Sequence, residues 1–156
     1  MKILDCTLRD GGYHTNWEFE PEFVRDLITV LDRTVVDVIE LGYKSPLRGG
    51  KYRKCSDKFI EKTIGFVPKS KLSFMIDTKD FVIDGKLDYN LIKTNIHENS
   101  IFSMCRVATT LDFLDYAKEL VSYLNSIGYT TTINLVRASI IELSELPSVI
   151  SQIDDS

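Results

Sequence analysis

The chain has 156 residues, of which 44% are hydrophobic, and its net charge of −4 comes from 19 basic and 23 acidic side chains. This balance argues against nucleic acid or an anionic membrane as a partner, and no apolar run approaches the ~20 residues of a membrane span. The three cysteines are odd in number and lack a Cys-x-x-Cys pair, which argues against a disulfide framework or a zinc knuckle and favours the cytoplasm. We expect Cys6 and Cys105, which lie in apolar strand-like runs, to be buried thiols.

Short runs of β-forming residues alternate with helical runs along the chain. The strands are predicted at residues 2–6, 35–43, 72–78, 101–109 and 130–138. The helices are predicted at residues 21–33, 56–67, 88–95, 112–127 and 144–153. The helix over 112–127 has the clearest apolar stripe, and Gly128 is expected to end it.

This alternation predicts an α/β fold with a parallel sheet and right-handed crossovers, built from five strand–helix units in a single domain over residues 1–156. Two architectures satisfy the pattern: an open doubly wound sheet and a closed TIM (β/α)8 barrel. No Gly-x-Gly-x-x-Gly or P-loop sequence follows a predicted strand, so the common nucleotide-binding versions of the open sheet lack support.

The first predicted strand carries an unusual set of polar residues. If the strand continues past residue 6, Asp5, Thr7 and Arg9 share one face, because side chains alternate along a strand. Leu4, Cys6 and Leu8 would then face the helices. A strand whose inner face is polar is costly unless those groups pair with each other or with a ligand. Gly11-Gly12 is expected to allow a sharp turn and a close approach to a bound species.

The run Leu-Asp-Cys-Thr-Leu-Arg-Asp-Gly-Gly-Tyr, residues 4–13, resembles the opening signature of the DRE-TIM metallolyase superfamily. That superfamily includes 3-hydroxy-3-methylglutaryl-CoA lyase, 4-hydroxy-2-oxovalerate aldolase and isopropylmalate synthase. Asn16-Trp17, shortly after the motif, makes the aldolase branch the most similar one. Weaker echoes follow at residues 39–43 and 106–109. The resemblance implies that the chain is the N-terminal part of a TIM barrel.

The resemblance also implies roles for residues at matching positions. Asp10 would be a ligand of a divalent cation, Mg²⁺ or Mn²⁺, because hard cations favour carboxylate oxygen. Arg9 would stabilise the enolate that forms when a C–C bond beside the carbonyl of a 2-oxo acid breaks. The implied activity is therefore that of an aldolase or lyase acting on a small 2-oxo acid or aldehyde. The related aldolases carry a catalytic histidine three residues after the metal-binding aspartate. Tyr13 has that spacing here and His14 follows it, so both are candidates for the proton transfer.

The chain departs from the superfamily in its histidines. The superfamily completes its metal site with a His-x-His pair on a late strand, whereas this chain has only His14 and His97. A full barrel needs about 250 residues, so we expect that further chain, another copy or a partner domain completes this one, and that it is inactive alone. Two alternatives stay open: an acyl-CoA condensation of the isopropylmalate synthase type, and an inactive barrel fragment used as a binding or assembly module.

Further candidates lie at the predicted carboxyl ends of the strands. Glu40 is expected to orient Arg9 or to contact substrate. Arg106, Asn16 and Ser139 are the other residues assigned to substrate binding, and Arg137, like Arg106, is expected inside an apolar strand. A basic segment over residues 44–58, which includes Lys44, Arg48 and Arg53, is predicted to rim the active-site mouth and attract an anion. Lys79 raises the rival mechanism of a Schiff-base aldolase.

Overall fold

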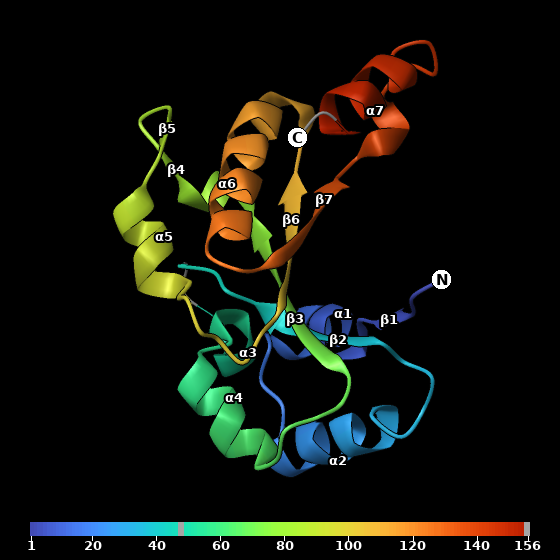
Figure 1. Ribbon diagram of the computed structural model, residues 1–156, viewed down its shortest axis with the longest axis vertical. Coiled ribbons are helices and arrows are strands. Elements are labelled where there is room, and N and C mark those ends of the chain that lie inside the picture. The colour runs from blue at the N-terminus through green and yellow to red at the C-terminus, as the bar shows by residue number, and fades with distance from the viewer. Residues whose placement is uncertain (47–48, 155–156) are drawn as a thin grey trace.

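The computed structural model describes residues 1–46 and 49–154 and contains one curled parallel sheet (Figure 1). Its strands are β1 (Leu4–Asp5), β2 (Val38–Tyr43), β3 (Lys71–Asp77), β6 (Met104–Thr109) and β7 (Thr130–Leu135), in the order β1-β2-β3-β6-β7. An open doubly wound sheet reverses its strand order at a switch point, and this order does not reverse. The sheet is therefore the N-terminal part of a (β/α)8 barrel, as the strand–helix repetition and the motif predict.

Helices follow the strands as predicted, with ends that differ from the predicted ones by at most three residues. They are α2 (Pro21–Leu31), α4 (Asp57–Ile64), α5 (Tyr89–Asn95), α6 (Leu114–Ser126) and α7 (Leu146–Asp154). Two helices and a hairpin were not predicted: α1 (Thr7–Thr15), α3 (Lys51–Lys54) and the hairpin of β4 (Val82–Ile83) with β5 (Lys86–Leu87). The short 3-10 helices at Thr78–Phe81, Leu111–Phe113 and Ala138–Ile140 were not predicted either. None of the helices in the described part of the chain has the length and apolar character needed to cross a bilayer.

The predicted first strand is wrong from residue 6 onward, because the chain turns into α1 instead. The Asp5 carboxylate accepts hydrogen bonds from the backbone nitrogen and the hydroxyl of Thr7, at 3.1 and 3.0 Å. These bonds favour a reversal of the chain at this point. Gly12 is helical and serves a close contact rather than a turn, since a Cβ there would lie 2.2 Å from the Trp17 ring. Consequently the expected alternation of Asp5, Thr7 and Arg9 on one strand face does not occur.

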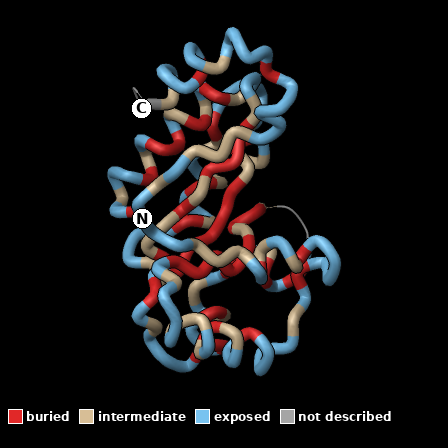
Figure 2. The backbone as a smooth tube through the Cα atoms, turned by 90° about the vertical axis from the view of Figure 1, so that its right-hand side faces the viewer, coloured by how far each residue is buried: buried red, intermediate tan, exposed pale blue. Residues whose placement is uncertain are grey.

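The two faces of the sheet differ in chemistry. The face covered by helices holds the hydrophobic core, including Ile39, Phe74 and Val107, all fully buried. Buried stretches run through the middle of the molecule, along the strands (Figure 2). The concave face forms a groove of about 520 Å³. Its lining residues are Lys2, Leu4, Val38, Lys71, Met104, Arg106, Thr130, Thr132 and Asn134. Leu4 thus faces the concave side, opposite to the direction expected from the sequence.

Lys44, expected on the rim of the site, is buried instead, with 1% of its side chain exposed. Its Nζ donates to both carboxylate oxygens of Asp57, at 2.9 and 3.2 Å. The same ammonium lies 4.9 Å from the ring centroids of Phe74 and Phe102. Ser100 also donates to Asp57. Lys44 therefore ties the end of β2 to α4 and to the segment before β6, which removes it from the basic rim.

This buried pair predicts unequal effects of two substitutions. Asp57→Ala leaves the Lys44 ammonium buried without its counter-ion and should lower the free energy of unfolding by about 3 kcal/mol. Lys44→Met should cost clearly less, because an apolar side chain of similar length fits between two phenyl rings and Asp57 can still reach water. Urea unfolding of the two variants checks this. Equal losses would show that the charge pairing contributes little.

Candidate active site

A buried carboxylate joins two arginines on the concave face of the sheet. The Glu40 side chain on β2 is fully buried. Its Oε1 accepts from Arg9 Nε at 2.8 Å and from Arg106 Nη1 at 3.0 Å, so α1, β2 and β6 meet at one oxygen. Burial alone would lower the pKa of Arg9, but the hydrogen bond and negative charge of Glu40 outweigh it and raise that pKa. Among the described residues, Glu40 Oε2 is buried without a hydrogen-bond partner.

Asp10 lies beside this cluster with 55% of its side chain exposed. Arg9 Nη1 is 2.6 Å from Asp10 Oδ1, and the Cys6 thiol donates to Oδ2 at 3.1 Å. Cys6 is therefore only partly buried, contrary to expectation, whereas Cys105 is buried as predicted. An accessible carboxylate fits a ligand of a hard divalent cation. No group of three or more histidine, cysteine or acidic side chains with the geometry of a metal site occurs within residues 1–46 and 49–154. The described chain thus offers one ligand rather than a complete set.

The two proton-transfer candidates lie in different surroundings. Tyr13 follows Arg9 by four residues on α1, so both side chains lie on one face of the helix. The Tyr13 hydroxyl is 2.7 Å from the Tyr43 hydroxyl. The Tyr13 and Tyr43 rings also pack edge-on against Trp17, at centroid distances of 4.7 and 5.7 Å. His14, in the last turn of α1, is exposed. The geometry therefore joins Tyr13, rather than His14, to the arginine cluster.

Tyr43 is the site residue that the sequence did not reveal. Burial raises its pKa above the ordinary tyrosine value, and the hydrogen bond with Tyr13 raises it further. The sequence places Tyr43 three residues after Glu40, which in a regular strand means opposite faces. Only the irregular register between these two residues brings them to the same face, and no residue pattern in the sequence indicates that irregularity.

The remaining candidates do not join the cluster. Asn16 ends α1 in the left-handed conformation at φ 54°, and Ser139 is exposed in a short 3-10 turn after β7. Arg137 is also exposed, beyond the end of β7 rather than inside the strand. Arg53 lies 4.8 Å from the Trp17 ring centroid. Arg48 lies outside the described residues.

Lys79 is paired with Asp77, whose Oδ2 lies 2.7 Å from Lys79 Nζ. The hydrogen bond to Asp77 and its charge raise the pKa of the lysine. A Schiff-base lysine attacks as the neutral amine, so this environment disfavours that mechanism.

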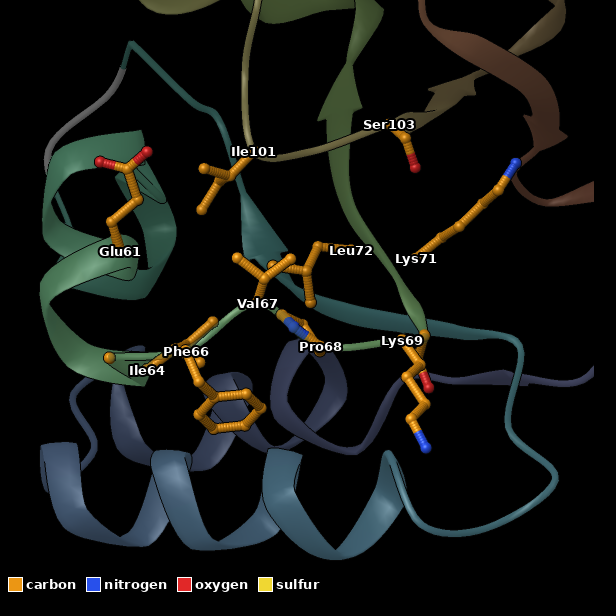
Figure 3. A pocket seen from close by; sticks show the side chains of 12 residues that line it. Glu61, Ile64, Phe66, Val67, Pro68, Lys69, Lys71, Leu72, Ile101 and Ser103 are labelled. Carbon is orange, nitrogen blue, oxygen red and sulfur yellow. The ribbon is translucent and has the colours of Figure 1, made fainter.

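A second hollow, of about 650 Å³, lies at the opposite end of the sheet (Figure 3). Apolar side chains such as Val67, Leu72 and Ile101 point into it, from the segment before β3, from β3 itself and from the segment before β6. In α/β barrels the amino-terminal end of the strands serves stability, and catalysis takes place at the other end. The arginine–carboxylate cluster, not this hollow, is therefore the candidate site.

The known proteins to which the sequence of this chain is similar include 4-hydroxy-2-oxovalerate aldolases. The chain is 24% identical to 4-hydroxy-2-oxovalerate aldolase 2 of Mycolicibacterium smegmatis over 155 residues, which is 94% of this chain and 41% of that protein. It is 30% identical to the 4-hydroxy-2-oxovalerate aldolase of Pelotomaculum thermopropionicum over 81 residues, which is 49% of this chain and 24% of that protein. The chain is a relative of the 4-hydroxy-2-oxovalerate aldolases. The resemblance predicted from the first motif is thereby confirmed.

Structural comparison agrees with this relationship. The crystal structure of the N-terminal domain of a "putative aldolase" from Bacteroides vulgatus superposes with a TM-score of 0.74 at 26% identity, covering 95% of this chain and 47% of that chain. The chain spans less than half the length of each of these three proteins. It matches no protein-family model.

Neutralising the Glu40 carboxylate, which two arginines share, should have a large effect on stability. Glu40→Gln leaves two arginines close together around an uncharged side chain and should lower the free energy of unfolding by about 3 kcal/mol. Glu61→Gln, on the exposed side of α4, is the matched control and should change it by less than about 0.5 kcal/mol. Urea titration followed by circular dichroism gives both values. A Glu40→Gln variant as stable as the control would contradict the dependence on this charge.

Proposed function

We propose that the protein is a divalent-metal-dependent carbon–carbon lyase, an aldolase that cleaves or forms a bond next to a 2-oxo acid through an enolate. One observation carries this proposal: Arg9 is held by the buried Glu40 directly beside the accessible Asp10, in a chain related to 4-hydroxy-2-oxovalerate aldolases. A guanidinium and an accessible carboxylate at one point are what enolate chemistry of this kind requires.

The chain's residues divide the chemistry between them. When the C–C bond breaks, its electron pair moves into the enolate, and the Arg9 guanidinium donates to the developing oxyanion. Because Arg9 is only 15% exposed, water screens its charge little. Asp10 would hold the Mg²⁺ or Mn²⁺ ion, which when bound supplies a second positive charge for the same oxygen. Arg106, which faces the concave groove, is suited to the substrate carboxylate.

The proton transfer and the outer contacts complete the proposal. Tyr13 would donate the proton that converts the enolate to the 2-oxo acid product, with His14 as the alternative donor. Asn16 and Ser139 are retained as substrate contacts at the rim. We further propose that the chain acts as the first five strands of a full barrel. The late histidine ligands would come from a further segment, another copy of the chain or a partner domain.

Binding of an enolate mimic tests the site directly. Oxalate resembles enolpyruvate, and calorimetry with Mn²⁺ plus oxalate should show binding to the chain that Asp10→Ala weakens more than about tenfold. Asp26→Ala, an exposed aspartate on α2, is the matched control and should bind as the unsubstituted chain does. Equal binding by the Asp10 variant and the control would remove Asp10 from the proposed site.

Borohydride trapping distinguishes this mechanism from the Schiff-base alternative. A lysine that forms an imine with pyruvate becomes irreversibly alkylated when borohydride reduces the imine. Because Asp77 keeps Lys79 protonated, mass spectrometry of the chain treated with pyruvate and borohydride should show no adduct on Lys79. An adduct that disappears in Lys79→Arg would overturn the metal-dependent proposal.

A further inference from the structure

An irregularity in β2 turns Tyr43 toward the candidate site. Glu40 pairs with Ser73 on β3, and Tyr43 pairs with Met75, so three steps along β2 match two steps along β3. Ser73 and Met75 lie two residues apart and share one face of β3. Glu40 and Tyr43 therefore share that face too. Such bulges commonly re-aim a side chain beside an active site.

The re-aimed phenol lies between two residues of α1. The Tyr43 hydroxyl lies within range of the positive charge of the Arg9 guanidinium. It also lies 2.7 Å from the hydroxyl of Tyr13, whose side chain is 62% exposed. The Trp17 ring packs edge-on against both phenol rings. Tyr43 is thus the inner member of a chain of polar groups that leads from Arg9 to the solvent-facing Tyr13.

We propose that Tyr43 is a positioning residue whose hydroxyl orients the Tyr13 hydroxyl as the proton donor of the site. This inference rests on the proposed function and extends it to a residue outside the opening motif.

The charge of Arg9 sets the direction of the hydrogen bond between the two tyrosines. A guanidinium is positively charged and has no acceptor, so it favours the Tyr43 oxygen lone pairs turned toward it. Tyr43 then directs its own hydrogen to the Tyr13 oxygen, which leaves the Tyr13 hydrogen to point at a bound species. In the reaction, the Tyr13 O–H bond breaks and a C–H bond forms at the enolate carbon. The resulting Tyr13 phenolate accepts a hydrogen bond from Tyr43 and regains a proton from water.

A conservative substitution separates this role from simple packing. Tyr43→Phe keeps the ring against Trp17 and removes only the hydroxyl, so the fluorescence of Trp17, the one tryptophan of the chain, should stay unchanged. In the chain labelled with ¹³C at the tyrosine Cζ atoms, the Tyr13 resonance, assigned through Tyr13→Phe, should shift in Tyr43→Phe. It should not shift in Tyr89→Phe, which removes a hydroxyl bonded to Glu119 away from the site. An unchanged Tyr13 resonance in Tyr43→Phe would overturn the proposal.

Exchange of the pyruvate methyl protons with deuterated water, in the presence of Mg²⁺, tests the proton transfer itself. Enolisation needs the site but no aldehyde. Tyr43→Phe should slow the exchange roughly tenfold, Tyr13→Phe should slow it more, and the double variant should match Tyr13→Phe alone, because both act on one proton. Exchange that is unaffected by Tyr43→Phe would overturn the positioning role and leave the proposed function standing. No exchange by the unsubstituted chain would mean that the site needs the late histidine ligands, and the Tyr13 resonance would then decide the role of Tyr43.

Discussion

The buried carboxylate of Glu40 is the interaction on which the site depends. An isolated charge inside a protein is costly, and this one is balanced by two guanidiniums bound to the same oxygen. The arginines come from α1 and β6, which lie 31 and 66 residues away in the sequence, so the contact forms only once α1, β2 and β6 have come together. The same Arg9 side chain also contacts Asp10. The placement of α1 on the sheet and the geometry of the candidate active site therefore depend on one group.

Sequence patterns predicted the fold well because most of the signal is local. Hydrophobic periodicity located the five strands and five helices that were expected, and the absence of a nucleotide-binding loop pointed away from the open sheet. The failures were of a different kind. Thr7–Thr15 follows a strand-like run and contains two glycines, yet it is helical, since Asp5 binds Thr7 and the Trp17 ring covers Gly12. Those contacts are local, but they depend on individual side chains and leave no periodic trace.

The candidate site could be predicted where a residue's neighbours in sequence are also its neighbours in space. Arg9, Asp10 and Tyr13 all belong to the opening motif, so the resemblance named them together, although the helix that brings Tyr13 to the same face as Arg9 was not predicted. Tyr43 could not be found in this way, because one extra residue in β2 reverses the direction of its side chain. Lys44 was misassigned for a similar reason: its basic neighbours suggested a solvated rim, but Asp57 and two phenyl rings hold it inside.

The fate of the basic segment also bears on the choice between the two enzyme mechanisms. The acyl-CoA condensation was the mechanism favoured by a basic segment at the rim, because such a segment would attract a large polyanion. Within the described residues, Lys44 is neutralised by Asp57 and Arg53 stacks on Trp17, which leaves Lys51, Lys54 and Lys58 as the exposed cations of this segment. The cations of the concave groove, Lys2, Lys71 and Arg106, lie on the strands themselves or beside their ends. Of these, Arg106 stands beside Glu40 at the candidate site, whereas Lys2 and Lys71 lie at the amino-terminal ends of the strands, away from it.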